Sequence, residues 1–186
     1  RDITSAYAVL ALSGPLSRAV LETLVDISLS DNDFPPYSLQ QFYIGHAPVF
    51  AQRLSFTGEM GWEIFITPDF AEYVFEQLYQ AGQAYDLRLA GGEALNALRI
   101  EKGFVHWGSD MAYTESPHQI GLGFACHVDK DIAFTGKAAY LSRRAEAKGP
   151  FLCSLKLQQP DAMLHHNEPV LRDGVIVGFI TSGAFS

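Results

Sequence analysis

Residues 57–66 have the sequence Thr-Gly-Glu-Met-Gly-Trp-Glu-Ile-Phe-Ile, a turn followed by a run of aromatic and β-branched side chains. Such a run predicts a β-strand, and the alternation of side chains along a strand places Glu63 and Phe65 on one face. The other face is wholly apolar, and neither face has the polar pattern of a solvated surface. A carboxylate in this position costs free energy unless it is paired. Glu63 is therefore either neutralised by a cation of the fold or held ready for a ligand that donates hydrogen bonds.

The segments around this strand alternate between extended and helical patterns, without the regular βαβ repeat of a parallel sheet. Extended patterns cover residues 5–12 and 42–56, the second broken at residues 45–48, and helical patterns cover residues 16–25, 68–81 and 93–102. We therefore predict an α+β fold with antiparallel sheets, in which the Glu63 strand forms a hairpin with a strand that contains Phe56. In the last of these helices we expect Leu95 and Leu98 to form the buried stripe, with Arg99 at its border.

Near the C-terminal end, the chain turns from helical to extended patterns at Gly149-Pro150. A polar helix is expected over residues 135–148, starting at Thr135 as its N-cap. Beyond the boundary, extended patterns cover residues 151–157, 169–171 and 175–181, and the Arg172-Asp173-Gly174 run between the last two is typical of a hairpin turn. We predict two domains, residues 1–148 and residues 149–186, and the second of them is β-rich.

The composition excludes several classes of function. With 13 Lys and Arg against 21 Asp and Glu, the net charge is −8, and no basic run offers a local nucleic-acid surface. No apolar run reaches the length of a membrane span, so neither nucleic acid nor a membrane is expected as a partner. Cys126 and Cys153 are isolated, which favours a reducing compartment, and we expect a cytoplasmic location.

The common catalytic and cofactor motifs are missing from the sequence. It has no G-x-S-x-G elbow, no Walker A loop and no G-x-G-x-x-G dinucleotide motif. His165 and His166 are adjacent rather than spaced for a shared metal ion, and Asp31-Asn32-Asp33 is followed by Phe34-Pro35-Pro36, which breaks the pattern of a calcium loop. We therefore expect no metal site, and the motifs assign no catalytic residue.

Four segments carry a resemblance to a known family: residues 7–21, 53–65, 94–108 and 121–136. In order and spacing they resemble the folate-binding aminomethyltransferases, which include the T-protein of the glycine cleavage system and the C-terminal halves of dimethylglycine dehydrogenase and sarcosine dehydrogenase. The Gly-Pro-Leu-Ser-Arg run at residues 14–18 is more similar to the flavoprotein branch. The resemblance covers nearly the whole chain. It implies the antiparallel-sheet lobes of the folate-binding fold, followed by part of a C-terminal β-barrel domain.

The resemblance also implies a folate-binding role for four residues. Glu63 falls at the position whose carboxylate holds the pterin, and a carboxylate can accept the adjacent amino and ring N–H groups of a pterin together. Arg99 falls at the arginine of the family's L-R-x-E segment, where it would border the cavity and balance Glu63. Phe56 stands where other members often carry Tyr, and Trp107 takes the aromatic position in the loop after the helix. The alternatives are core packing for the two aromatic residues and a structural ion pair for the two charged ones.

The function implied is transfer of a one-carbon (methylene) unit from an N-methylglycine-type or aminomethyl donor to tetrahydrofolate, within a protein similar to dimethylglycine or sarcosine dehydrogenase. FAD is expected only if a separate flavin domain, fused or associated, accompanies the chain. Family members begin well before Arg1, and the acidic residue thought to act beside the folate lies in that earlier segment. We therefore expect these residues alone to be inactive and the catalytic group to lie outside them.

Three alternatives stay open. A free-standing aminomethyltransferase would lack the flavin domain. A non-enzymatic folate-binding relative of the iron–sulfur cluster maintenance type is less favoured, because that branch carries a K-G-C-Y-x-G-Q-E segment, whereas residues 102–108 here, Lys-Gly-Phe-Val-His-Trp-Gly, have no cysteine. The third alternative is a demethylase of a sulfonium substrate on the same fold.

Overall fold

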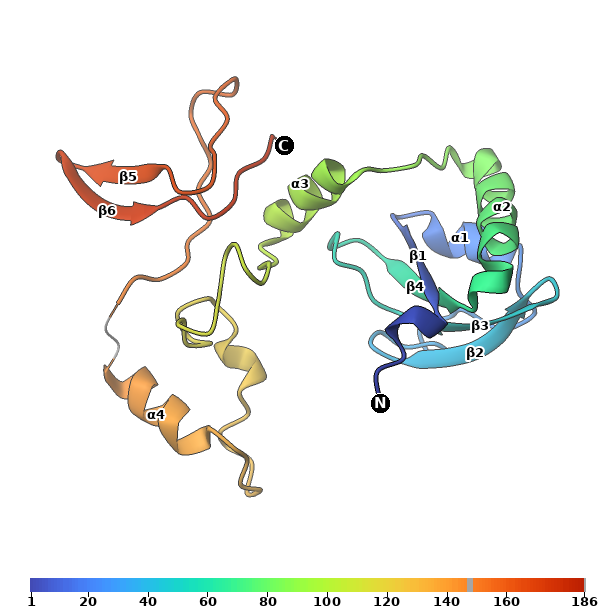
Figure 1. Ribbon diagram of the computed structural model, residues 1–186, viewed down its shortest axis with the longest axis horizontal. Helices are drawn as coiled ribbons and strands as arrows, with labels where there is room; N and C mark the ends of the chain where they lie inside the picture. The colour runs from blue at the N-terminus through green and yellow to red at the C-terminus, as the bar shows by residue number, and fades with distance from the viewer. Residues whose placement is uncertain (147–148, 186) are drawn as a thin grey trace. The chain divides into compact units, whose positions relative to one another are not determined.

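The computed structural model describes residues 1–146 and 149–185, and the chain divides into two compact units, Arg1–Leu95 and Asn96–Ser186. The first unit contains β1 (Ala8–Ser13), α1 (Ser17–Glu22), β2 (Leu39–Ile44), β3 (Ala47–Gln52), β4 (Gly61–Ile66) and α2 (Ala71–Gly82), with short 3-10 turns at Thr4–Ala6, Pro68–Phe70 and Gln83–Tyr85. Its strands form one sheet in the order β1-β4-β3-β2, and every neighbouring pair is antiparallel (Figure 1). The prediction of an α+β fold with an antiparallel sheet is confirmed.

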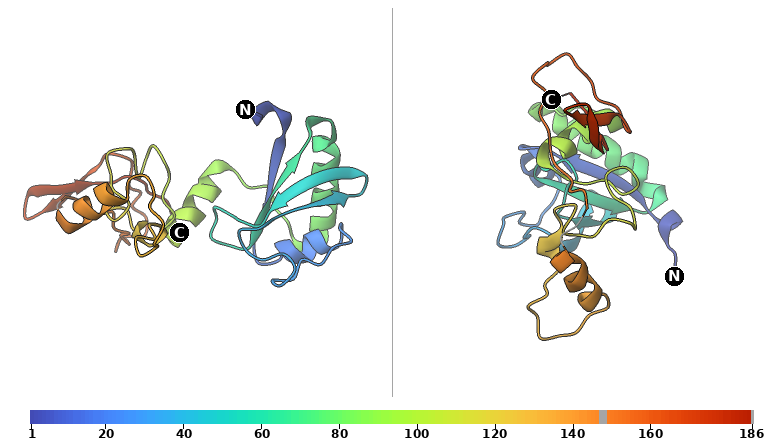
Figure 2. Two further views of the ribbon diagram at one scale, coloured as in Figure 1. Left: turned by 90° about the horizontal axis from the view of Figure 1, so that it is seen from below. Right: turned by 90° about the vertical axis from the view of Figure 1, so that its left-hand side faces the viewer.

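One face of this sheet forms the floor of the hydrophobic core. Alternate residues of the strands point into it, and Ile64 of β4 is fully buried there. Val20 and Leu21 of α1 belong to the same core. So do Val74 and Leu78 of α2, and both helices lie beside the sheet in the left view of Figure 2. Because both helices pack on this face, the strand residues of the opposite face are half-buried or exposed, apart from Gly61, which is buried.

The hairpin that carries Glu63 is formed by β3 and β4, with Gln52 directly opposite Glu63. Since β3 ends at Gln52, the prediction that Phe56 lies in the partner strand is wrong, and Phe56 lies in the connecting loop of residues 53–60. The loop's own serine and threonine side chains bond to its backbone. Such local hydrogen bonds compete with pairing between strands, which explains why the strand ends early.

The second unit is built around short elements. Helix α3 (Gly92–Lys102) begins at the end of the first unit, and it is followed by a 3-10 turn at Gly123–Ala125, α4 (Lys137–Glu146), β5 (Pro169–Arg172) and β6 (Val175–Phe179). β5 and β6 form the predicted antiparallel hairpin. Asp173 and Gly174 have φ angles of 52° and 78°, the left-handed values that a two-residue type I′ turn requires. No helix in the described part of the chain is long and apolar enough to cross a membrane.

Two expectations for this unit need correction. Residues 151–157 form no strand, and the Leu152 N–H donates to the Gln119 carbonyl rather than to a neighbouring strand. Helix α4 begins at Lys137, later than the predicted cap, because Gly136 has a non-helical φ of 90°. The predicted end of this helix and the predicted domain boundary fall at residues 147–148, outside the described residues.

Helix α3 buries a different side from the one that its leucines predict. Leu95 and Leu98 are 41% and 38% exposed, whereas Arg99 is only 4% exposed. The expected apolar stripe is therefore wrong. The physical reason lies in the hydrogen-bonding partners that surround the Arg99 guanidinium.

Candidate functional site

The loop before β4 is held by its own polar side chains. Thr57 is buried, and its hydroxyl lies 2.6 Å from the Ser55 hydroxyl. The Thr57 backbone N–H donates to the Ser55 hydroxyl at 3.1 Å, and the Glu59 backbone N–H donates to the Thr57 hydroxyl at 3.3 Å. The threonine of the Thr-Gly-Glu motif therefore orders the turn, while Glu59 itself is exposed.

Both glycines of the motif are required by the backbone. Gly58 has a φ of 78°, which strains any residue with a Cβ atom. A Cβ atom on Gly61 would lie 2.8 Å from the Leu12 carbonyl oxygen and 2.9 Å from the Ser13 Cβ. Only glycine therefore lets β4 start this close to β1, and this close approach sets where Glu63 emerges two residues later.

A clamp from the start of α1 holds the same loop. The Ser17 hydroxyl lies 2.7 Å from the Gly14 carbonyl and 3.1 Å from the Met60 carbonyl. The Gly14 backbone N–H also donates to the Met60 carbonyl, at 2.8 Å. The Gly-Pro-Leu-Ser run, which the sequence marks as a helix start, thus fixes the residue just before β4.

Arg53 stabilises the helix-covered side of the loop. Its guanidinium donates to the Phe34 carbonyl at 2.6 Å and to the Asp31 carboxylate at 2.7 Å, and it lies 5.9 Å from the centre of the Trp62 ring. Hydrogen bonds from Arg53 and from Arg18 lower the pKa of Asp31 below its usual value. These cations are engaged with Asp31, on the side of the sheet that Glu63 does not face.

Glu63 lies on the face of the sheet that the helices leave uncovered. Across the strands it is flanked by Ala11 of β1 and Gln52 of β3, in direct register. The next residue of β4 on this face is Phe65, and Phe50 lies directly opposite it. We call the surface formed by Glu63, Gln52, Phe65 and Phe50 the Glu63 face. It combines two half-buried aromatic rings with one carboxylate and one amide.

The Glu63 carboxylate has no partner among the described residues. Glu63 is half-buried, yet no hydrogen bond or ion pair joins its side chain to any residue among 1–146 and 149–185. Of the two explanations for a charge in this strand, neutralisation by a cation of the fold is therefore not supported by the described contacts. A carboxylate that is half-desolvated and unpaired gains most from a ligand that supplies N–H donors.

In the second unit, Arg99 and Asp110 form a buried ion pair, and both side chains are 5% exposed. The Arg99 guanidinium also donates to the Asn96 amide oxygen, to the Phe104 carbonyl at 3.1 Å and to the Ser182 hydroxyl at 2.6 Å. All of its hydrogen-bonding directions are therefore used within this unit. These partners explain why α3 turns its arginine inward and leaves its leucines exposed.

Asp110 collects hydrogen bonds from three separate segments. It accepts the His106 backbone N–H at 2.8 Å and the hydroxyls of Thr181 and Ser182 at 2.6 Å each. Burial raises the pKa of Asp110, but the hydrogen bonds from Ser182, Thr181 and His106, with the charge of Arg99, outweigh it and hold the pKa below the usual value. The carboxylate thus ties the end of the β5–β6 hairpin to α3 and the loop that follows it.

The four residues predicted to bind folate are divided between the two units. Glu63 and Phe56 belong to the first unit, where Phe56 is half-buried in the loop before β4. Arg99 and Trp107 belong to the second. Trp107 is 62% exposed and lies in the loop that Arg99 and Asp110 hold, forming an isolated bridge with Met111. None of the four lines the depression of about 380 Å³ at the free edge of β2.

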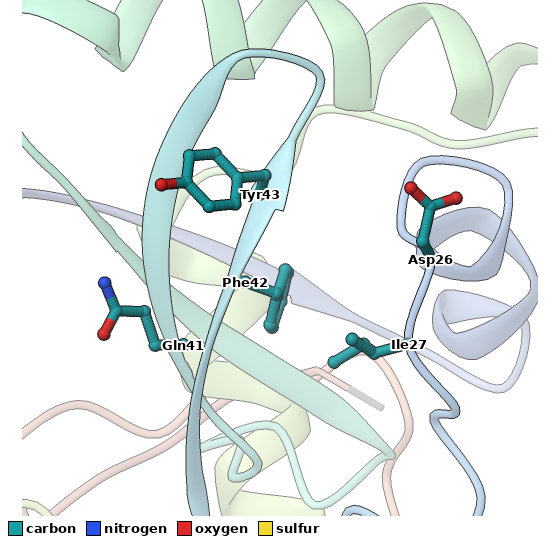
Figure 3. Close-up of a pocket in the computed structure, with 5 residues that line it drawn as sticks. All are labelled: Asp26, Ile27, Gln41, Phe42 and Tyr43. Carbon is teal, nitrogen blue, oxygen red and sulfur yellow. The ribbon is translucent and has the colours of Figure 1, made fainter.

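That depression is formed by Asp26, Ile27 and the end of β2. Gln41 and Tyr43 point to one side of the strand, and Phe42 points toward Ile27 (Figure 3). It offers an open, mainly apolar surface without a cluster of reactive groups. In the part of the chain that the structure describes, no group of three or more His, Cys, Asp or Glu side chains could hold a metal ion.

Two polar residues of these sites were missed from the sequence. The alternation of side chains places Gln52 opposite Glu63 only when the length of the loop between β3 and β4 is known, and the sequence did not give that length. Asp110 lies in a segment without periodicity, and no local pattern marks it as the partner of Arg99.

Comparison with known proteins adds independent findings. Residues 1–130 match the family model of the GCVT N-terminal domain, and residues 151–186 match that of the glycine cleavage T-protein C-terminal barrel domain. Mitochondrial dimethylglycine dehydrogenase of Rattus norvegicus is 37% identical over 186 residues, which cover 100% of this chain and 22% of that protein. An aminomethyltransferase of Halothermothrix orenii is 34% identical over 180 residues, 97% of this chain and 49% of that protein.

A solved structure is also similar to this one. The crystal structure of glycine cleavage system aminomethyltransferase T from Bartonella henselae superimposes with a TM-score of 0.60 at 28% identity, covering 77% of this chain and 37% of that one. The chain thus spans about a fifth of the dehydrogenase and about half of the Halothermothrix aminomethyltransferase.

Proposed function

The chain belongs to the glycine cleavage T-protein family, and from this membership we propose that it is a tetrahydrofolate-binding module that transfers a methylene unit to tetrahydrofolate. The donor we propose is an N-methylglycine-type or aminomethyl compound, within a protein similar to dimethylglycine or sarcosine dehydrogenase. The dehydrogenase relative, which this chain matches over its whole length, supports that choice.

One observation carries the proposal: the unpaired carboxylate of Glu63 on a half-buried aromatic sheet face. The pyrimidine edge of a pterin presents an amino group and a ring N–H side by side, and a carboxylate accepts both in a bidentate pair. Phe65 and Phe50 offer apolar surface next to it for a flat ring system. The residues present therefore fit the ligand that the family implies.

The other predicted contacts take supporting roles in this proposal. Phe56 would pack against the ligand from the loop before β4, without the hydroxyl that a tyrosine would add. The folate contact predicted for Trp107, in the second unit, stays a prediction. The folate contact predicted for Arg99 stays a prediction, and the partners of its guanidinium favour a role in holding the Trp107 loop. We also propose the domain boundaries 1–148 and 149–186.

The proposed transfer changes no oxidation state. An N-methylene iminium and tetrahydrofolate give methylenetetrahydrofolate, the free amine and one proton: two C–N bonds form to the folate nitrogens, and both bonds to the amine nitrogen break. The sequence has no G-x-G-x-x-G motif, so FAD would belong to a separate domain that oxidises the amine. The cytoplasmic location expected from the sequence stays a prediction, since the dehydrogenase relative is named mitochondrial.

Substitution of Glu63 in the full-length protein tests the proposal. Glu63→Gln should weaken tetrahydrofolate binding about tenfold to a hundredfold, because an amide offers one acceptor and turns its NH2 group against the donors of the pterin; a charge-assisted hydrogen bond contributes about 1.5–3 kcal/mol. Isothermal titration calorimetry with tetrahydrofolate measures the change.

Glu59→Gln is the matched control, because it makes the same substitution four residues earlier at an exposed position. It should bind tetrahydrofolate like the wild type. Oxidation of the amine by an attached flavin domain should be nearly unchanged in both variants. Equal affinities of the wild type and Glu63→Gln would make Glu63 structural and remove the basis of the proposal.

A further inference from the structure

Gln52 lies on the Glu63 face where its side chain could bind the same ligand as Glu63. It lies directly opposite Glu63 in the β3–β4 ladder. Side chains at directly opposed positions of an antiparallel pair leave the same face of the sheet, with Cβ atoms about 4.5–5.5 Å apart. The amide and the carboxylate can therefore reach the same small ligand.

Within the described part of the chain, the Gln52 side chain also lacks a hydrogen-bonding partner. Gln52 is half-buried, and no hydrogen bond joins its amide to another residue in the described ranges, although its backbone carbonyl accepts the Leu54 N–H at 3.0 Å. A half-buried amide without a partner has lost part of its hydration and gained nothing in return. Two such polar groups, Gln52 and Glu63, face each other across a single strand pair.

The chemistry of the two groups is complementary to one particular ring edge. A 2-amino-4-oxopyrimidine ring presents, in order, an amino N–H, a ring N–H and a carbonyl oxygen. The Glu63 carboxylate accepts the first two, and the Gln52 amide can donate to the third. We infer that Gln52 is a specificity-determining residue that binds the 4-oxo group of the pterin beside Glu63; this inference rests on the proposed function.

Gln41 shows what an ordinary glutamine on this side of the sheet is like. It leaves the same face from the edge strand β2, where it pairs with Phe50. It is exposed and contributes to the open depression of Figure 3. Gln52 differs from it in lying on an inner strand, half-buried, and next to the only carboxylate of the Glu63 face.

Gln52→Met in the full-length protein tests the inference, because methionine keeps the length of the side chain and removes its hydrogen-bonding groups. Two probes are titrated by calorimetry: tetrahydrofolate and 6-methyltetrahydropterin, which has the ring but no p-aminobenzoylglutamate tail. Loss of one neutral hydrogen bond should weaken both probes by the same factor, about threefold to tenfold. Gln41→Met, the matched control, should bind both like the wild type. If Gln52→Met does not fold, Gln52→Asn, which withdraws the amide by one methylene group, should show the same loss.

Three results would overturn the inference: unchanged affinity of the Gln52 variant, an equal loss in Gln41→Met, or a loss for tetrahydrofolate that is absent for the tailless pterin. The last result would place Gln52 against the tail. Glu63→Gln decides the proposed function separately. A normal Gln52→Met variant beside a defective Glu63→Gln variant would remove the role of Gln52 and leave the folate site in place.

Discussion

Each unit of the molecule contains one carboxylate that its sequence context does not explain, and the two are used in opposite ways. Asp110 is buried and receives an arginine, two hydroxyls and a backbone N–H. Glu63 is half-buried and receives nothing from the described residues. Both sites remove a charge from water, but only the first compensates it from within the fold.

The difference separates a structural charge from a ligand-binding one. A buried carboxylate with all of its lone pairs occupied has no capacity left for a ligand, so its contribution appears as stability. An unpaired carboxylate contributes little to stability and keeps its capacity for binding. We therefore expect substitution of Asp110 to change the stability of its unit, and substitution of Glu63 to change ligand binding with little change in stability.

The largest effect is expected for Asp110→Asn. It leaves the buried guanidinium of Arg99 without its counter-charge, and breaking a buried pair in this way costs about 3–5 kcal/mol. Hydrogen exchange of peptides from α3 and β6 in the full-length protein should report a loss of opening free energy of that size. Asp129→Asn, at an exposed position of the same unit, is the control and should change it by less than about 0.5 kcal/mol.

The same measurement on β4 peptides sharpens the comparison. Glu63→Gln should leave the opening free energy of the first unit within about 0.5 kcal/mol of the wild type, because no internal partner is lost. A destabilisation of β4 comparable to that caused by Asp110→Asn would show that Glu63 has a structural partner, and the contrast between the carboxylates would fail.

An effect smaller than that of Asp110→Asn but larger than that of Glu63→Gln is expected from Gly61→Ala. The added Cβ would lie within 3.0 Å of Leu12, Ser13 and Ser55 atoms, and such overpacking typically costs about 1–3 kcal/mol. Opening of β4 should become easier by that amount, and tetrahydrofolate binding should weaken because Glu63 is displaced. The control is Gly178→Ala in β6, where nothing lies within 4 Å of the new atom. Stability equal to the wild type in Gly61→Ala would show that the loop yields and does not fix Glu63.

The last prediction is a pH dependence of the stabilisation that Asp110 gives to the second unit. The pKa of Asp110 is lowered in the fold, so its stabilisation is complete above the ordinary value of 3.8 and is lost as the pH falls through the lower folded value. The difference in opening free energy of α3 between the wild type and Asp110→Asn should be constant above about pH 5 and shrink below about pH 4. If this difference in opening free energy stayed constant below about pH 4, the lowered pKa of Asp110 would not be the source of the stabilisation.

Strand alternation and turn chemistry were enough to predict much of the first unit. The pattern of Trp62 to Ile66 placed Glu63 and Phe65 on the opposite face from the apolar residues, and the Asp173-Gly174 turn predicted the β5–β6 hairpin. These features depend on interactions between residues close in sequence, which is why a sequence alone reveals them. The family resemblance, confirmed by the two matching family models, supplied the identity of the ligand to be tested.

Two of the predictions that failed depend on partners distant in sequence. Apolar periodicity suggested that Leu95 and Leu98 are buried, but the side of α3 that turns inward is decided by Asp110 and Ser182, 11 and 83 residues away from Arg99. The segment of residues 151–157 has the composition of a strand, yet a strand forms only where a second chain segment completes its hydrogen bonds. Local composition contains neither piece of information.

Because the two tryptophans differ in exposure, their fluorescence can follow the two units separately. The chain has two, one in each unit: Trp62 is 1% exposed under the Arg53 side chain, and Trp107 is 62% exposed. Indole emission moves to longer wavelength when water relaxes around the excited ring, so the two residues emit at opposite ends of the protein range. In a Trp107→Phe variant, the emission wavelength of Trp62 would change only when the first unit opens. In a Trp62→Phe variant, a ligand that binds near the Trp107 loop would quench or shield the emission of Trp107. Each unit thus has its own fluorescent reporter.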